Sequence, residues 1–278
     1  MEPVLKWAGG KRKLVTSIIQ LIDLKQLNNH RLFEPFFGGG SLTFSLECEK
    51  ATINDLNPEL YNVYIQIRDN PDELIKALKI HNKNHSHDYY YKIRNLDRLA
   101  SYKKLSSIKK AARIIYLNRT CFNGLYRVNS NGFFNVPLGR TTSGKPDIVC
   151  EDKIRAISKY LNKPGIEILN CDFVEAVKTA GEGDYVYLDP PYDYEPSGFT
   201  SYTSRGFSQD DLRRLEKLCE SLVERGAIVI VSNNSTLFVN EIFSKNIFKF
   251  NYLNVHRNIS GNNSGRRTVR EVLIYGKK

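Results

Sequence analysis

The chain has 278 residues, enough to bury a substantial core as one large domain or as a domain that carries an insert. Hydrophobic residues make up 41% and charged residues 26%, which is ordinary for a globular protein, and no apolar run is long enough to cross a bilayer. The formal net charge of +11 fits either general solubility or a polyanionic partner, and composition alone does not choose between them.

The N-terminal residues and the cysteines indicate a cytoplasmic protein without a structural metal. The stretch M-E-P-V-L-K-W-A-G-G-K-R-K has no apolar core of the kind found in secretory signals. The five cysteines are odd in number, far apart and free of C-x-x-C pairs, so we expect reduced, packed thiols. His81, His85 and His87 alternate with Asn and Ser, without a suitably spaced Cys or acid, so no metal site is predicted.

Strands and helices alternate at both ends of the chain, and the middle is helical. In the first half we predict a helix at 11–22, a strand at 31–35, a turn at 36–40, a helix at 41–48, a strand at 51–54, almost continuous helix over 58–118 and a β-hairpin at 122–139. In the second half we predict strands at 166–169, 184–189 and 227–232, helices at 173–180 and 208–225, and final strands near 247–256 and 270–275. This order predicts a mostly parallel α/β sheet that the helical insert splits between its second and third strands.

A glycine-rich turn and an acid indicate a nucleoside-containing cofactor. Phe36 begins the turn F-F-G-G-G, in which Gly38 and Gly40 let the backbone approach a ligand, although a tight strand-to-helix link needs glycines as well. Asp55 closes the next strand, where a carboxylate can accept hydrogen bonds from ribose hydroxyls. The turn has the form F-x-G-x-G and lacks a pyrophosphate-binding pattern, which favours S-adenosylmethionine over NAD or ATP.

The segment N-C-D-F ends the third predicted strand. Asp172 and Phe173 could meet the adenine ring of the cofactor at this point. Asp172 is equally suited to cap the helix that follows, and the sequence leaves both interpretations open.

The segment Y-L-D-P-P-Y stops a strand with two prolines. Asp189 precedes them and is therefore extended, and the prolines stiffen the corner and leave their carbonyl groups without a local donor. The Asp189 carboxylate and the Pro190 carbonyl can accept both hydrogens of one amino group, which aims the nitrogen lone pair at an activated methyl. Tyr192 offers a flat face on which a base can stack. The alternative is a proline-rich turn that only leaves the sheet.

Six short blocks occur in order along the chain. They are K-W-A-G-G-K (6–11), F-E-P-F-F-G-G-G (33–40), N-D (54–55), F-N-G-L-Y-R (122–127), F-N-V-P-L-G-R (134–140) and D-P-P-Y (189–192). Together they resemble the Dam-type DNA adenine N6-methyltransferases, over most of the chain. The resemblance implies a Rossmann-like sheet with a reversed final hairpin, a catalytic domain of residues 1–56 and 151–278, and a target-recognition insert of residues 57–150.

The resemblance also implies a reaction. A methyl group passes from S-adenosylmethionine directly to N6 of an adenine that is flipped out of double-stranded DNA, within the sequence GATC. By resemblance, Trp7, Lys11, Asp55 and Asp189 line the cofactor pocket. Core packing for Trp7 and a solvated first helical turn for Lys11 are the alternatives.

Candidate DNA contacts lie mainly in the predicted hairpin. Arg127 could bond to a guanine edge, Leu125 and Pro137 could touch thymine methyl groups, and Phe122 could wedge between base pairs. Equally, the apolar residues Phe122, Leu125 and Pro137 could form the core of the hairpin, and Arg127 could be a solvated charge. The resemblance favours DNA contacts, and the full set it implies is Lys6 on the first guanine, Arg127 on the final pair, Phe122, Asn123, Leu125, Asn135, Pro137 and Arg140, with Arg266 and Arg267 on phosphates. Position 122 carries Phe where some relatives carry Tyr.

Four other functions are alternatives to adenine N6 methylation. Cytosine N4 methylation uses a similar corner, but relatives that perform it more often carry Ser in place of Asp189. Cytosine C5 methylation needs a thiolate that usually follows a proline, and the chain has no Pro-Cys. A catalytically silent DNA-binding regulator and an NAD-linked oxidoreductase are further alternatives. The expected oligomeric state is a monomer.

Overall fold

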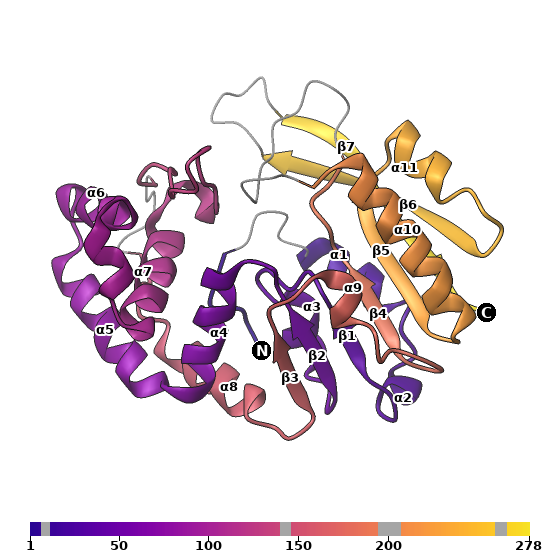
Figure 1. Ribbon diagram of the computed structural model, residues 1–278, viewed down its shortest axis with the longest axis horizontal. Coiled ribbons are helices and arrows are strands. Elements are labelled where there is room, and N and C mark those ends of the chain that lie inside the picture. Colours follow the sequence, from indigo (N-terminus) through magenta and orange to yellow (C-terminus); the bar gives the residue numbers. More distant parts are fainter. Residues whose placement is uncertain (7–11, 140–145, 194–206, 259–265) are drawn as a thin grey trace.

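The computed structural model of the chain describes residues 1–6, 12–139, 146–193, 207–258 and 266–278 (Figure 1). Within these residues, seven strands form one sheet in the order β3-β2-β1-β4-β5-β7-β6. The strands are β1 (Leu32–Glu34), β2 (Ala51–Asn54), β3 (Ile166–Leu169), β4 (Tyr185–Leu188), β5 (Ile228–Asn234), β6 (Phe248–Asn258) and β7 (Arg266–Gly276).

The first five strands are parallel, and β7 pairs antiparallel with both β5 and β6. Leu32 of β1 lies opposite Ala51 of β2 on one side and Tyr185 of β4 on the other. The strand order reverses between β1 and β4, and in open α/β sheets ligands bind outside the carboxyl ends of the strands at such a point. The predicted α/β class and the reversed final hairpin are therefore confirmed.

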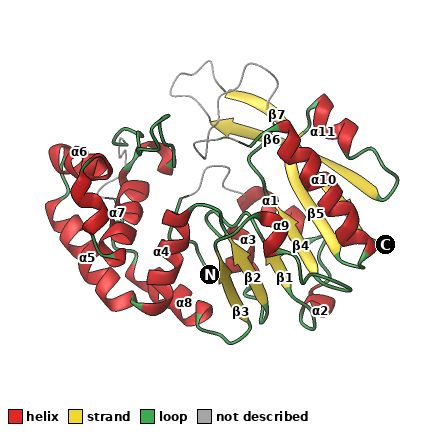
Figure 2. Ribbon diagram, in the orientation of Figure 1, coloured by secondary structure: helices red, strands yellow, loops and turns green. Residues whose placement is uncertain are grey.

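Helices cover both faces of the sheet (Figure 2). They are α1 (Arg12–Ile19), α2 (Leu24–Leu27) and α3 (Ser41–Leu46) near the start of the chain, and α9 (Phe173–Ala176), α10 (Gln209–Glu224) and α11 (Leu237–Ile242) in the second half. Alternate strand residues belong to two separate cores: Tyr185 and Tyr187 pack with the residues of α1 and α3, whereas Val186 and Leu188 pack with those of α9 and α10. This period of two is the one that a sheet buried on both faces requires.

The middle of the chain is helical and forms a lobe beyond the β3 edge of the sheet (Figure 1). Its elements are α4 (Pro58–Asp69), α5 (Pro71–Asn84), α6 (His87–Arg94), the 3-10 helices η1 (Asn95–Arg98) and η2 (Ala100–Lys104), and α7 (Ser107–Thr120). Pro58 and Pro71 start their helices at the position where a missing N–H is harmless, and Ser86 and Ser106 cap the next ones through their hydroxyl groups. Helix α8 (Glu151–Leu161), which the sequence analysis did not predict, returns the chain to the sheet.

The 122–139 hairpin differs from its prediction. The chain makes a turn in which the Gly132 N–H bonds to the Asn129 carbonyl, but no regular strand forms over these residues. Only two isolated antiparallel bridges occur, Val128 with Phe134 and Cys121 with Leu138, and the segment begins with the short 3-10 helix η3 (Phe122–Gly124). Asn123 has a φ of 53°, which breaks any strand at that point.

In the part of the chain that the structure describes, no helix combines the length and the apolar character needed to cross a membrane.

Candidate active site and nucleic-acid interface

The glycine turn and the D-P-P-Y corner meet where the strand order reverses. The turn follows β1 and the corner follows β4, and these two parallel strands are direct neighbours in the sheet. Both segments therefore leave the same edge of the sheet, at its topological switch point. The sequence predicted each segment separately, and the sheet order brings them together.

The glycine turn is stabilised from inside the protein. Gly38 and Gly40 have φ values of 50° and 70°, in the left-handed region that favours glycine. A Cβ on Gly40 would lie only 2.4 Å from Phe37 Cζ and 2.6 Å from Phe44 Cε2. The Gly38 carbonyl accepts a hydrogen bond of 2.7 Å from the buried Tyr64 hydroxyl. Gly40 is thus required for packing, and Gly38 for the course of the turn.

Asp55 connects β2 to the glycine turn. Its Oδ2 accepts a hydrogen bond of 2.9 Å from the Gly38 N–H, and its Oδ1 accepts one of 2.9 Å from the Asn57 N–H. Burial raises the pKa of this carboxyl to about 6, although the two N–H groups act in the opposite direction. The side chain is only half-buried, so a carboxylate oxygen can still face a ligand at the strand ends.

Aromatic rings and an ion pair lie at the end of β3. The ring centroids of Phe36 and Phe173 are 5.3 Å apart, and Phe207 approaches Phe36 edge-on at 5.8 Å. Asp172 caps α9 through the Val174 N–H at 3.0 Å and pairs with Arg214 Nη2 at 3.1 Å. The capping interpretation of Asp172 is therefore confirmed, while its contact with a cofactor adenine stays a prediction.

The D-P-P-Y corner is held by the neighbouring strand β5. Ser232 Oγ donates a hydrogen bond of 2.8 Å to Asp189 Oδ1, and the hydroxyls of Ser232 and Tyr187 are 3.1 Å apart. Because the single Ser232 proton points to Asp189, Tyr187 is the donor to Ser232. The Tyr187 hydroxyl is buried, and burial raises its pKa well above the ordinary value, so it remains a donor. Tyr187, Ser232 and Asp189 thus form one oriented chain.

The residue after the corner is fixed as well. The Asp193 N–H donates to Asn233 Oδ1 at 2.9 Å, and Asn234 Nδ2 donates to the Asp193 carbonyl at 2.7 Å. Thr236 Oγ1 donates to the Asp193 carboxylate at 2.6 Å. Consecutive residues at the end of β5 therefore hold both the side chain and the backbone of the corner.

Two glutamates lie beside the corner. Glu271 of β7 is buried, and its Oε2 accepts a long hydrogen bond of 3.5 Å from the Tyr192 hydroxyl. Glu34, the last residue of β1, accepts hydrogen bonds from the backbone N–H and the hydroxyl of Thr43. Burial is the main reason that the pKa of Glu34 rises to about 8, and the nearby Asp189 charge raises it further. Glu34 is therefore mainly protonated at neutral pH.

The predicted DNA-reading residues are gathered in the 122–139 hairpin. Asn123, Arg127 and Pro137 are exposed, whereas Phe122 and Leu125 are half-buried and pack against the core. The structure thus supports core packing for the last two and excludes it for Pro137. Arg127 Nε donates to Asn135 Oδ1 at 2.7 Å, so Arg127 is exposed but oriented.

Lys6 lies against the same hairpin, although 112 residues separate it from the side chain that holds it there. The buried Asn118 accepts from the Lys6 N–H at 2.7 Å and donates to the carbonyls of Lys6 and Gly124 at 2.6 and 3.0 Å. Gly124 has a φ of 63°, and a Cβ there would lie 2.4 Å from Lys6 Cβ. This close approach positions the exposed Lys6 beside Arg127's segment.

Several predicted site residues belong to segments that the structure does not describe. Trp7, Lys11 and Arg140 lie outside the described residues. Arg266 and Arg267 begin β7, opposite Asn258 and Arg257, but their side chains are outside the described part.

The residues that hold the site were not predicted from the sequence. They are Glu34, Asn118, Tyr187, Ser232, Asn233, Asn234 and Thr236. One signal was available: S-N-N ends a buried strand, and buried polar side chains need hydrogen-bond partners.

The donor set agrees with a sulfonium nucleoside. The half-buried Asp55 offers carboxylate oxygens for hydroxyl groups, the Phe36–Phe173 pair offers aromatic surface, and Asp189 offers a carboxylate that could face a cationic sulfur. Among the described residues, no cluster of His, Cys, Asp and Glu side chains could hold a metal ion.

The sheet order with its antiparallel last strand defines a Rossmann-like methyltransferase fold. A family model for the D12 class N6 adenine-specific DNA methyltransferases matches residues 7–260. The chain therefore belongs to this family, and it is an adenine-specific DNA methyltransferase.

Curated relatives agree with this membership. Over 99% of its length, the chain is 44% identical to the type II methyltransferase M1.LlaDCHI of Lactococcus lactis subsp. cremoris, of which 96% is covered. It is 36% identical to the type II methyltransferase M.MjaIII of Methanocaldococcus jannaschii, over 84% of each protein. It is 30% identical to the DNA adenine methylase of Escherichia coli strain K12, over 98% of this chain and 94% of the relative. The family decides the choice between adenine N6 and cytosine N4 in favour of adenine.

Proposed function

We propose that this methyltransferase takes its methyl group from S-adenosylmethionine and transfers it directly to N6 of an adenine flipped out of duplex DNA, within GATC. The observation that carries the proposal is the meeting of the glycine turn and the D-P-P-Y corner at the switch point of the sheet.

The cofactor would be held at the ends of β1 to β4. Asp55 would accept hydrogen bonds from the ribose hydroxyls, and Phe36 with Phe173 would pack against the adenine. Trp7 and Lys11 complete the pocket by family resemblance. When bound, S-adenosylmethionine supplies an electrophilic methyl group on a positively charged sulfur.

Asp189 would activate the amine by accepting one N6 hydrogen, while the Pro190 carbonyl accepts the other. An aromatic amine is a weak nucleophile because its lone pair is delocalised into the ring, and two acceptors in fixed positions favour the tetrahedral nitrogen that attacks. Ser232 holds Asp189 Oδ1 in place at 2.8 Å, so the carboxylate needs no reorganisation during the reaction. After attack the nitrogen carries one proton too many, and Asp189 or water accepts it.

The target base has to leave the duplex to reach Asp189, at a cost of a few kcal/mol. Tyr192 would stack on the extruded base. The exposed Lys6, which lies beside Gly124 of the hairpin, and the exposed Arg127 would read guanines at the two ends of GATC, with Leu125 and Pro137 near thymine methyl groups. Asn123 and Arg140 belong to this surface by resemblance, as do Arg266 and Arg267 on the phosphates. Double-stranded DNA as partner also accounts for the net charge of +11.

Short duplexes provide the test. One duplex contains GATC, and the others differ from it by one base pair; each is incubated with labelled S-adenosylmethionine, and the modified nucleoside is identified after digestion. We expect N6-methyladenine in the GATC duplex, with each substitution lowering kcat/KM. Incorporation without preference for GATC would refute the proposed recognition sequence. If no label passes from S-adenosylmethionine to any duplex, the proposed cofactor is wrong. A fluorescent 2-aminopurine at the target position reports base flipping.

The corner is tested by Asp189→Ala. Loss of a preorganised hydrogen-bonding group lowers kcat by about 100- to 1,000-fold, and DNA binding should persist. The control is Asp88→Asn, because the Asp88 side chain is fully exposed on α6. Equal activity of both variants would contradict the assignment.

A further inference from the structure

The 122–139 hairpin has little backbone structure to fix its orientation. Its two bridges are isolated, and apart from these its backbone hydrogen bonds lie in the turn and near its base. An irregular segment of this kind has many conformations of similar energy, and a surface that reads base edges needs one of them. Contacts from outside the hairpin must therefore select its conformation.

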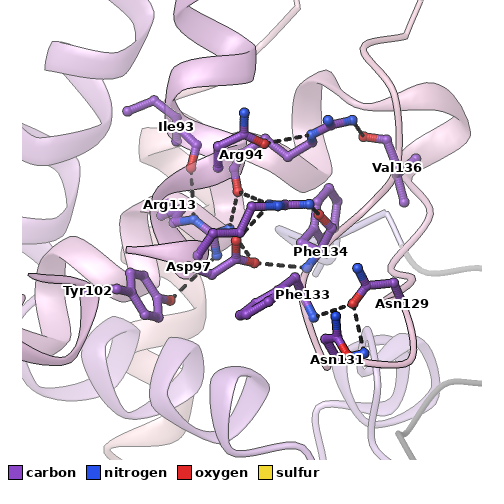
Figure 3. Close-up of polar contacts among 12 residues, drawn as sticks. Ile93, Arg94, Asp97, Tyr102, Arg113, Asn129, Asn131, Phe133, Phe134 and Val136 are labelled. Carbon is purple, nitrogen blue, oxygen red and sulfur yellow. Dashed lines mark hydrogen bonds and ion pairs between the residues drawn. The ribbon is translucent and has the colours of Figure 1, made fainter. Parts of the chain in front are cut away.

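These contacts come from α6 and η1, and they reach the returning arm of the hairpin (Figure 3). Asp97 Oδ2 accepts a hydrogen bond of 2.8 Å from the Phe134 N–H, and Arg98 Nη2 donates to the Phe134 carbonyl at 3.0 Å. Two residues further on, the buried Tyr90 hydroxyl donates to the Val136 carbonyl at 2.9 Å. The backbone is thus held on both sides of Asn135.

Asn135 in turn orients Arg127. Its N–H donates to the Arg127 carbonyl at 3.1 Å, and its Oδ1 accepts from Arg127 Nε at 2.7 Å. Because the guanidinium is planar, a fixed Nε also fixes the plane in which the two terminal nitrogens lie. The position of Asn135 therefore determines the direction in which Arg127 presents its remaining donors.

Asp97 is itself held from behind. Arg113 of α7 is buried, and its Nη2 lies 2.8 Å from Asp97 Oδ2. The same guanidinium donates to the carbonyls of Ile93 and Arg94 at 2.9 and 2.7 Å, which fixes it against the end of α6 (Figure 3). A buried charge with this many directed bonds has a single low-energy position, and it transmits that position to Asp97.

We propose that Asp97 is a positioning residue for target recognition: held by Arg113, it fixes the Phe134–Val136 arm, and through Asn135 it sets the orientation of Arg127 toward the DNA. The inference rests on the proposed function of the hairpin. It gives Asn135 the task of orienting Arg127, in addition to any contact of its own with DNA.

The test measures sequence discrimination separately from folding and catalysis. Asp97→Asn keeps an acceptor oxygen but loses the charge that binds Arg113. We expect the ratio of kcat/KM between GATC and a duplex altered at the Arg127 base pair to fall by roughly tenfold, within the range of one bidentate base contact. At saturating GATC and cofactor, kcat should stay within about twofold, because the corner is untouched.

Two further variants keep the result decisive. Tyr90→Phe removes only the hydrogen bond to the Val136 carbonyl and preserves the Asp97–Arg113 pair. This variant therefore tests the inference even if Asp97→Asn folds poorly. We expect it to lose less discrimination than Asp97→Asn. Asp147→Asn is the matched control. Asp147 pairs at 3.4 Å with Arg119, which lies on α7 as Arg113 does, and Asp147 makes no described contact with the hairpin. Melting temperatures of all variants are measured, and assays run well below them.

The outcomes separate the two proposals. If wild type methylates GATC selectively and both Asp97→Asn and Tyr90→Phe keep its selectivity, the positioning inference is wrong. If selectivity falls only together with kcat at saturation, Asp97 has a merely structural role and the inference is also wrong. If wild type shows no selectivity for any base pair, the proposed function fails first.

Discussion

The D-P-P-Y corner and the 122–139 hairpin are both irregular segments, but they are held in different ways. The corner leaves β4 and is bonded by Ser232, Asn233 and Asn234 of β5, the next strand in the sheet. Among the described residues no strand pairs with the hairpin, and charged and polar side chains of α6, η1 and α7 hold it. One segment is fixed by the sheet and the other by a buried ion pair.

This difference matches the two tasks that we propose for these segments, catalysis at the corner and recognition at the hairpin. Chemistry on one amino group is the same for every member of the family, and a sheet edge provides a rigid frame for it. Recognition depends on a few side chains that must point in one direction, and a side-chain network can hold these without a continuous ladder of backbone bonds. We expect changes at the corner to affect kcat and changes at the hairpin support to affect discrimination and stability.

The largest expected effect is on the hairpin side. Asp97→Ala leaves the Arg113 guanidinium buried without its carboxylate, which should lower the free energy of unfolding by about 3–5 kcal/mol. Urea denaturation measures this. Asp210→Ala removes the exposed partner of the exposed Arg213 on α10, where a loss of less than about 1 kcal/mol is expected. Equal losses of unfolding free energy in the two variants would show that the buried Asp97–Arg113 pair stabilises the protein no more than an exposed pair does.

On the corner side, Glu34 should make the free energy of unfolding strongly dependent on pH. Its folded pKa of about 8 lies above the ordinary value of 4.5, so folding takes up a proton between these values. Its stabilising contribution is complete below pH 4.5 and is lost as the pH rises toward 8, at about 1.4 kcal/mol per unit. Glu34→Gln keeps an acceptor for Thr43 and cannot ionise.

Unfolding free energies at pH 5 to 8 test this, with the values chosen to span the Glu34 window. The free energy of unfolding of Glu34→Gln should increase relative to that of wild type as the pH rises. Glu73→Gln, at an exposed site on α5, is the control and should follow wild type. Parallel curves for wild type and Glu34→Gln would show that Glu34 is not held protonated.

Ser232→Ala should lower kcat while leaving discrimination intact. Its hydrogen bond to the Asp189 carboxylate is charge-assisted, and its loss is worth about 1.5–3 kcal/mol, or roughly ten- to hundredfold in rate. Single-turnover methyl transfer measures the effect. Ser221→Ala on the exposed side of α10 serves as control. If Ser232→Ala instead altered the preference among duplexes and left kcat unchanged, the assignment of catalysis to the corner and discrimination to the hairpin would be wrong.

The smallest expected effects come from a matched pair of tyrosines. Tyr187→Phe removes the donor to Ser232, and Tyr90→Phe removes the donor to Val136, each worth about 1 kcal/mol. We expect roughly fivefold slower transfer from the first and a similar loss of discrimination from the second. The same change in both variants would mean that corner and hairpin act as one unit.

Much of the fold could be predicted from local patterns. The strand at 166–169 was placed correctly, and those at 31–35 and 184–189 to within one residue at each end. Helix α8 was missed because its apolar residues, including Ile154 and Ile157, follow a link rich in Gly, Pro and Ser. The hairpin was predicted too regular, because alternation of residues does not show that Asn123 has a positive φ.

The sequence by itself determined the glycine turn, the acid after the second strand, the stiff D-P-P-Y corner and the family, because each is a short pattern whose chemistry is local. Only the tertiary structure decided which residues hold these parts. Ser232 lies 43 residues from Asp189, and Asp97 lies 37 residues from Phe134. Contacts of this kind arise when a sheet and a helical lobe pack, and no periodicity along the chain encodes the partner that a buried polar group will find.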